Sequence, residues 1–194
     1  MLTYHAPDSV YAKLRESFSA EQIVQPTFYR NGDQQLESSD DYLHCAPRGR
    51  TMTGEIVSVT RLDQIQLCAP VLRELRTALT EEQIVERVQQ QMREGYRLVC
   101  INSSEAVQSV AGYRIMQNLH YGKFLYVDDL VTRADSKRNG FAGRLLDWLW
   151  DHAGEQGCSA LVLDSGVQRF EAHRFYLRHR MDIVAHHFMR KLGE

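Results

Sequence analysis

The sequence predicts an α/β fold built on a mixed sheet, and three observations support this. Strand-like and helix-like patterns alternate from residue 54 onward. The apolar segments 107–116 and 124–132 flank a polar turn at 118–123, which is typical of an antiparallel hairpin. The helical segment near 141–153 then leads into the apolar run 160–164, so that strand, helix and strand form a right-handed parallel crossover.

Residues 1–53 have a different character from the rest of the chain. They contain a polar, acidic stretch, Glu37-Ser38-Ser39-Asp40-Asp41, and little sign of regular structure. We therefore expect an N-terminal extension, 1–53, of unknown role, followed by a single domain, 54–194. A surface arm packed on this domain is the simplest interpretation of the extension.

The individual elements follow from periodicity in chain order. Residues 55–60 alternate like a strand, and Leu67, Val71, Leu72 and Leu75 recur at helical spacing, so 63–76 is expected to be a helix despite Pro70. A second helix begins at the capping box of Thr80 and ends at Gly95. Further strands are expected at 96–101, 107–116, 124–132, 160–164 and 182–189, and further helices at 141–153 and 168–178.

Composition excludes several classes of protein. With 23 Lys and Arg against 25 Asp and Glu, the net charge is −2, which removes the electrostatic argument for non-specific nucleic-acid binding. No apolar run approaches the roughly 20 residues that span a bilayer, and the first residues do not resemble a signal peptide. The four cysteines are scattered, so we expect reduced thiols in a cytoplasmic protein without a membrane or nucleic-acid partner.

The loop at 135–144 is the most informative segment. It lies between a strand and a helix, where unpaired backbone N–H groups and the helix dipole favour an anion. Gly140 and Gly143 allow close approach of a phosphate, and Lys137 and Arg138 add positive charge. On these features alone, a plain loop remains an equal alternative.

The arrangement of elements over 54–194 resembles the GNAT superfamily of acetyl-CoA-dependent N-acetyltransferases. The family's pyrophosphate loop, Gln/Arg-x-x-Gly-x-Gly/Ala, is similar to Lys137-Arg138-Asn139-Gly140-Phe141-Ala142, with Lys137 at the first position. The segment 124–132 resembles the family's fourth strand, and 172–177 resembles its last helix. The resemblance implies a GNAT fold, with helices on both faces of a sheet that is splayed between strands four and five.

The resemblance also implies a binding site for acetyl-CoA as co-substrate. The pantetheine arm and acyl carbonyl would lie against the main chain of Leu130, Val131 and Thr132. The pyrophosphate would be bound by Lys137, Arg138, Asn139, Gly140, Phe141, Ala142 and Gly143.

Two residues are candidates for the chemistry. The resemblance aligns Asp128 with the family's strand-four glutamate, a general base, although the adjacent Asp129 would face the opposite side of a regular strand. It aligns Tyr176 with the family's tyrosine that protonates the departing thiolate. The alternatives are an ion-paired aspartate and a tyrosine that only packs in the core.

The sequence therefore predicts an N-acetyltransferase that moves an acetyl group from acetyl-CoA to a primary amine of a small molecule or peptide. Direct attack in a ternary complex is expected because no cysteine has a nucleophile's setting, and the histidines do not form a metal site. Asp40, Asp41 and Asp128 suggest a cationic acceptor such as a polyamine, unless the acidic run is only solvated surface. A non-catalytic acyl-CoA-binding module, an interaction protein that uses 1–53, and homodimerisation remain open.

Overall fold

The computed structural model describes residues 54–103 and 106–193, which contain a five-stranded sheet in the order β1-β2-β3-β4-β5. The first four strands are antiparallel neighbours, and β5 is parallel to β4. Their bounds are β1 Glu55–Val59, β2 Arg97–Asn102, β3 Val107–Asn118, β4 Gly122–Thr132 and β5 Leu161–Leu163. The predicted mixed sheet is confirmed, whereas the expected extension at 1–53 lies outside the described residues.

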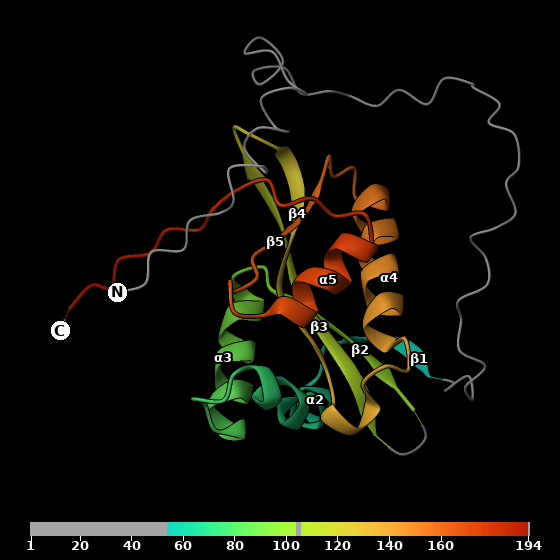
Figure 1. Cartoon of the computed structure of the whole chain (residues 1–194). Helices are drawn as coiled ribbons and strands as arrows, with labels where there is room; N and C mark the ends of the chain where they lie inside the picture. Colours follow the sequence, from blue (N-terminus) through green and yellow to red (C-terminus); the bar gives the residue numbers. More distant parts are fainter. Residues whose placement is uncertain (1–53, 104–105, 194) are drawn as a thin grey trace, which may run out of the picture. The chain divides into compact units, whose positions relative to one another are not determined.

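Helices cover both faces of this sheet (Figure 1). The helices α2 (Leu62–Leu75) and α3 (Glu81–Arg93) pack together on one face, and α4 (Phe141–Glu155) covers the other. The short helix α5 (Phe170–Arg178) ends near the start of α4, where a Cβ on Gly143 would lie 3.2 Å from Nε2 of His179. None of the helices in these ranges is both long and apolar enough to cross a membrane.

Local signals account for where several elements begin and end. Thr80 Oγ1 accepts from the Gln83 N–H, and Gln83 Oε1 accepts from the Thr80 N–H, so the predicted capping box opens α3. Asn118 Oδ1 accepts from the N–H groups of His120 and Tyr121, which closes the turn between β3 and β4.

Alternation along the strands divides the core into two layers. Leu98 and Cys100 face α2 and α3, whereas Val99 and Ile101 face α4. Burial on both faces explains the nearly continuous apolar run of β2. It also means that any polar side chain at the centre of the sheet needs a partner.

The sheet is splayed between its last two strands. β5 pairs only with residues 125–127 of β4, so the same edge of 128–132 has no strand partner in the part of the chain that the structure describes. A polar backbone edge is thus left available beside the start of α4. The predicted separation of strands four and five is confirmed.

The prediction of a strand at 182–189 was wrong, because residues 181–193 form no strand in the structure. The segment lacks a period of two, since Ile183 and Val184 are adjacent, as are Phe188 and Met189. All four side chains are exposed. The edge strand β5 is only three residues long, so it offers little backbone to pair with.

Arg180, at the exit of α5, provides a test of backbone strain. Its φ of 60° lies in the left-handed region, and its N–H donates to the Leu177 carbonyl. A non-glycine residue there costs about 1 kcal/mol. We predict that Arg180→Gly raises the free energy of unfolding by roughly 0.5–1 kcal/mol in urea denaturation. Arg174→Gly, at an exposed site inside α5, should lower the free energy of unfolding by about 1 kcal/mol. Equal effects of the two variants would contradict the backbone strain at Arg180.

Candidate active site

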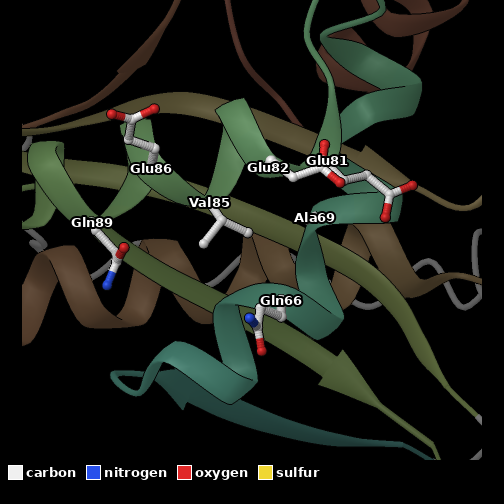
Figure 2. A pocket seen from close by; sticks show the side chains of 7 residues that line it. All are labelled: Gln66, Ala69, Glu81, Glu82, Val85, Glu86 and Gln89. Carbon is white, nitrogen blue, oxygen red and sulfur yellow. The ribbon is translucent and has the colours of Figure 1, made fainter.

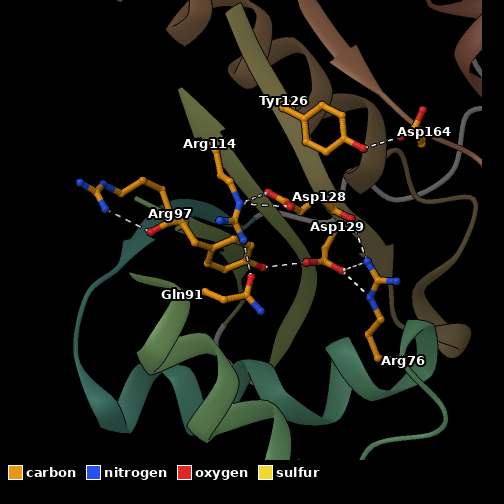
Figure 3. A network of polar contacts seen from close by, with 9 residues as sticks. Arg76, Gln91, Arg97, Arg114, Tyr126, Asp128, Asp129 and Asp164 are labelled. Carbon is orange, nitrogen blue, oxygen red and sulfur yellow. Dashed lines mark hydrogen bonds and ion pairs between the residues drawn. The ribbon is translucent and has the colours of Figure 1, made fainter. Parts of the chain in front are cut away.

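A β-bulge in β4 shapes the centre of the candidate site. Gly112 of β3 pairs with Asp129, and the next residue, Tyr113, pairs with Val127, so Asp128 has no opposite residue. Val127 faces the α4 layer, and in a regular strand Asp129 would face it too. The extra residue turns Asp129 to the α2 and α3 side, where Asp128 also lies (Figure 3).

Asp129 is held by two partners from distant parts of the chain. The buried hydroxyl of Tyr96 donates to Oδ2 over 2.9 Å, and Nε of Arg76 donates to Oδ1 over 2.8 Å. Burial, followed by the charge of Asp129, raises the pKa of Tyr96 well above its usual value, so the phenol remains a donor. Gly112 makes room for this contact, since a Cβ there would lie 1.8 Å from the Tyr96 oxygen.

Asp128 is bound by Arg114, which projects from β3. Nε of Arg114 donates to both carboxylate oxygens, at 3.2 and 3.0 Å, and its Nη2 donates to Gln91 of α3 over 2.6 Å. The guanidinium also lies over the Tyr96 ring, 5.5 Å from its centroid. Burial raises the pKa of Asp128 above its usual value, while Arg114 opposes this change. The carboxylate is therefore ion-paired and also more basic than an exposed aspartate.

Both carboxylates line a pocket of about 340 Å³, here called the Asp128 pocket (Figure 3 shows the polar network around it). Its floor is apolar, from α2, α3 and the turn between them, and its polar lining comes from the end of α2, from α3, from the turn before β2 and from β4. The lining residues are Leu72, Arg76, Leu79, Ile84, Arg87, Val88, Gln91, Tyr96, Asp128 and Asp129. Such a concave site, with an apolar floor and convergent polar groups, suits a small molecule.

A second pocket, of about 430 Å³, shares none of these residues (Figure 2). It lies between α2 and α3 and is lined by Gln66, Ala69, Glu81, Glu82, Val85, Glu86 and Gln89. None of the candidate site residues predicted from the sequence lines it.

The loop before α4 has the backbone shape expected of an anion site. Gly140 caps the helix with a φ of 81°, and no atom lies within 4 Å of a Cβ placed on it. The N–H groups of the first turn have no intrahelical acceptor. Lys137, Arg138 and Asn139 are exposed before it, whereas the Phe141 side chain is buried in the α4 layer, which leaves only its backbone for a ligand.

The remaining predicted residues do not all lie together. Leu130 packs into the α4 layer, Val131 into the α2 and α3 layer, and Oγ1 of Thr132 lies 2.8 Å from Oγ of Ser109. Tyr176 lies in α5 and does not line the Asp128 pocket. Burial raises its pKa above the usual value, with Arg169 acting in the opposite direction.

Sequence reasoning missed the partners of the two aspartates. Arg76, Gln91, Tyr96 and Arg114 come from four different elements or their ends. Only Arg114 left a signal, as a charged residue in the apolar run of β3.

Within 54–103 and 106–193, no three His, Cys, Asp or Glu side chains gather in a way that could hold a metal. Nδ1 of His187 lies 3.0 Å from Oδ2 of Asp164.

Comparison with known proteins gives consistent matches. A sequence model of the acetyltransferase (GNAT) family matches residues 60–180. The chain is 35% identical over 108 residues to an uncharacterised N-acetyltransferase of Bacillus subtilis, YhdJ, and the match covers 55% of this chain and 76% of that protein.

Solved structures of low identity share the fold. A ribosomal-protein-alanine N-acetyltransferase from Brucella melitensis has a TM-score of 0.64 and 17% identity, over 73% of this chain and 100% of that one. Glucosamine-6-phosphate N-acetyltransferase from Arabidopsis thaliana has a TM-score of 0.60 and 18% identity, over 73% of this chain and 99% of that one.

The close contact between Gly112 and Tyr96 generates a prediction. Gly112→Ala should displace the Tyr96 ring from Asp129 and lower the free energy of unfolding by about 2 kcal/mol or more. Gly154→Ala in α4 is the control, because nothing lies within 4 Å of its Cβ, and it should raise stability by roughly 0.5–1 kcal/mol. Urea denaturation would measure both, and an unaffected Gly112→Ala would contradict the packing described.

Proposed function

The chain belongs to the GNAT acetyltransferase family and is an acyltransferase enzyme; on that premise, we propose that it transfers an acetyl group from acetyl-CoA directly to a primary amine of a small molecule or peptide. The family uses acetyl-CoA, and its members act on amine acceptors. The observation that carries the proposal is the Asp128 pocket, in which a carboxylate of raised pKa lies beside the unpaired edge of β4.

The residues present suit acetyl-CoA. The open space at Gly140 and the free N–H groups of the first α4 turn fit a pyrophosphate, with Lys137 and Arg138 adding positive charge. We assign the pyrophosphate to 137–143 and the pantetheine arm to the main chain of Leu130, Val131 and Thr132. When bound, acetyl-CoA supplies a thioester carbonyl for attack by the amine and a thiolate as leaving group.

Asp128 serves as the general base in this proposal. An amine with a pKa of about 10 is mostly protonated at neutral pH and must lose a proton before it can attack. The partly buried Asp128 carboxylate accepts this proton directly or through a water molecule. Arg114 keeps the carboxylate ionised and oriented, because it donates to both oxygens.

Tyr176 serves as the general acid. Burial raises the pKa of Tyr176, so the phenol keeps its proton at neutral pH until the thiolate forms, and in this proposal it then donates to that thiolate. Direct transfer is favoured over an acyl-enzyme because Cys68 and Cys100 are buried in the core and no described cysteine lines the Asp128 pocket.

The family match also supports the proposed domain division, since residues 60–180 lie inside the domain 54–194. A cytoplasmic location and homodimerisation are part of the same proposal.

Asp128→Asn and Tyr176→Phe should each lower kcat by roughly 100-fold, because each removes one proton-transfer group, and each should leave coenzyme A affinity unchanged. Asp151→Asn, on the exposed surface of α4, is the control. Because the pKa of Asp128 is raised, kcat/KM of the wild type should fall as the pH drops through a value above 3.8, and Asp128→Asn should lose this acid limb. Wild-type turnover in both variants would refute these roles.

Two glycines at opposite ends of α4 allow a matched test of the coenzyme site. Gly140 and Gly157 both have positive φ, 81° and 68°, with no atom within 4 Å of a Cβ. Alanine should therefore cost similar stability at either position. We predict that only Gly140→Ala weakens coenzyme A binding, by about tenfold in calorimetry, because a methyl group there obstructs the phosphate. Equal affinities would place the pyrophosphate elsewhere.

A further inference from the structure

The Asp128 pocket contains guanidinium donors that the two aspartates do not use. A guanidinium carries five N–H bonds. Arg76 donates through Nε and Nη2 to Asp129 and to the Asp128 carbonyl, so Nη1 has no partner among the described residues. Arg87, on α3, lines the same pocket and makes no ion pair or hydrogen bond with any residue that the structure describes.

The charges around the pocket do not cancel. Arg76, Arg87, Asp128 and Asp129 line the pocket, and a third guanidinium group, that of Arg114, lies outside the lining in an ion pair with Asp128. Each carboxylate already has its own arginine, because Asp129 is paired with Arg76 and Asp128 with Arg114. The excess positive charge therefore belongs to Arg87.

Below these charges the pocket is aliphatic. Leu72, Ile84 and Val88 are buried, and Leu79 is partly buried beside them. An apolar floor and a cationic wall favour a ligand with a hydrocarbon body and an anionic group.

We propose that the acceptor is a small amine that also carries a carboxylate or phosphate group, and that Arg87, assisted by the free Nη1 of Arg76, binds this group. The inference rests on the proposed function, since it places the acceptor amine at Asp128. Guanidinium donors bind either anion in a bidentate manner.

The same charges disfavour the polyamine suggested by the sequence. The suggestion of a polyamine rested on three aspartates. Two of them, Asp40 and Asp41, lie outside the described residues, and the charge of Asp128 is already matched by Arg114. A polyamine would place a second ammonium group near an unpaired arginine, which is unfavourable.

Matched acceptors test the inference with the full chain and acetyl-CoA. L-leucine and isopentylamine differ only by a carboxylate, O-phosphoethanolamine and ethanolamine differ only by a phosphate, and spermidine represents the polyamines. Following free-thiol release, we expect kcat/KM for the member with the carboxylate or phosphate in at least one pair to exceed that of its partner without this group by about tenfold or more. The pair that discriminates identifies the anion.

Arg87→Gln should raise KM for the preferred acceptor with an anionic group by about tenfold, with little change in kcat and no change for its partner without that group. The control is Arg93→Gln, which removes the same charge from α3 at an exposed site outside the pocket. It should leave every acceptor unaffected. Calorimetry of L-leucine or O-phosphoethanolamine into protein saturated with coenzyme A should show the same loss of affinity in Arg87→Gln only.

Faster turnover of spermidine or of the amines without an anionic group would overturn the inference and leave the acetyltransferase proposal intact. Equal kinetics of the two arginine variants would do the same. If coenzyme A binds but no acceptor is turned over, equal calorimetric heat for amines with and without the anionic group overturns it as well. If coenzyme A itself does not bind, the proposed function fails and takes this inference with it.

Discussion

The bulge at Asp128 is the constraint on which the site depends. One residue without an opposite on β3 reverses the alternation of β4, so that Asp129 turns from the α4 layer to the side where Asp128 already lies. Two adjacent carboxylates then share one pocket, which a regular strand would not permit. Burying two negative charges this close requires compensation, and Arg76 and Arg114 provide it from elements far apart in the sequence.

That compensation links the fold to the chemistry. Tyr96 reaches Asp129 only because Gly112 lacks a side chain, and the Tyr96 ring in turn lies beneath the Arg114 guanidinium. A single glycine on β3 therefore supports the ion pairs of both aspartates. The splay of β5 away from β4 begins at the same point in the strand, so the pocket on one face and the unpaired edge arise together. In the proposed mechanism, the amine lies in the Asp128 pocket and the thioester lies at the unpaired edge of β4, so the two reactants meet at this point of the strand.

Periodicity predicted most of the fold because most elements bury a regular stripe. The capping box at Thr80 and the strand-to-helix turn at Gly140 were visible because their signals are local. The prediction of a strand at 182–189 was wrong because this segment has the apolar content of a strand but lacks the alternation and the partner edge that a strand also needs. The charge network could not be predicted, since Arg76, Tyr96 and Arg114 meet the aspartates only through tertiary packing, and a bulge has no reliable sequence signature. Whether one or both aspartates face the pocket depended on that bulge.

A crystal structure of the full chain with coenzyme A tests the central claim most directly. The account predicts that the pyrophosphate contacts backbone N–H groups within 137–143 and that the thiol end lies beside 128–132, within reach of an amine held at Asp128. A pyrophosphate bound elsewhere, or a thiol on the α4 side of the sheet and remote from the Asp128 pocket, would contradict it.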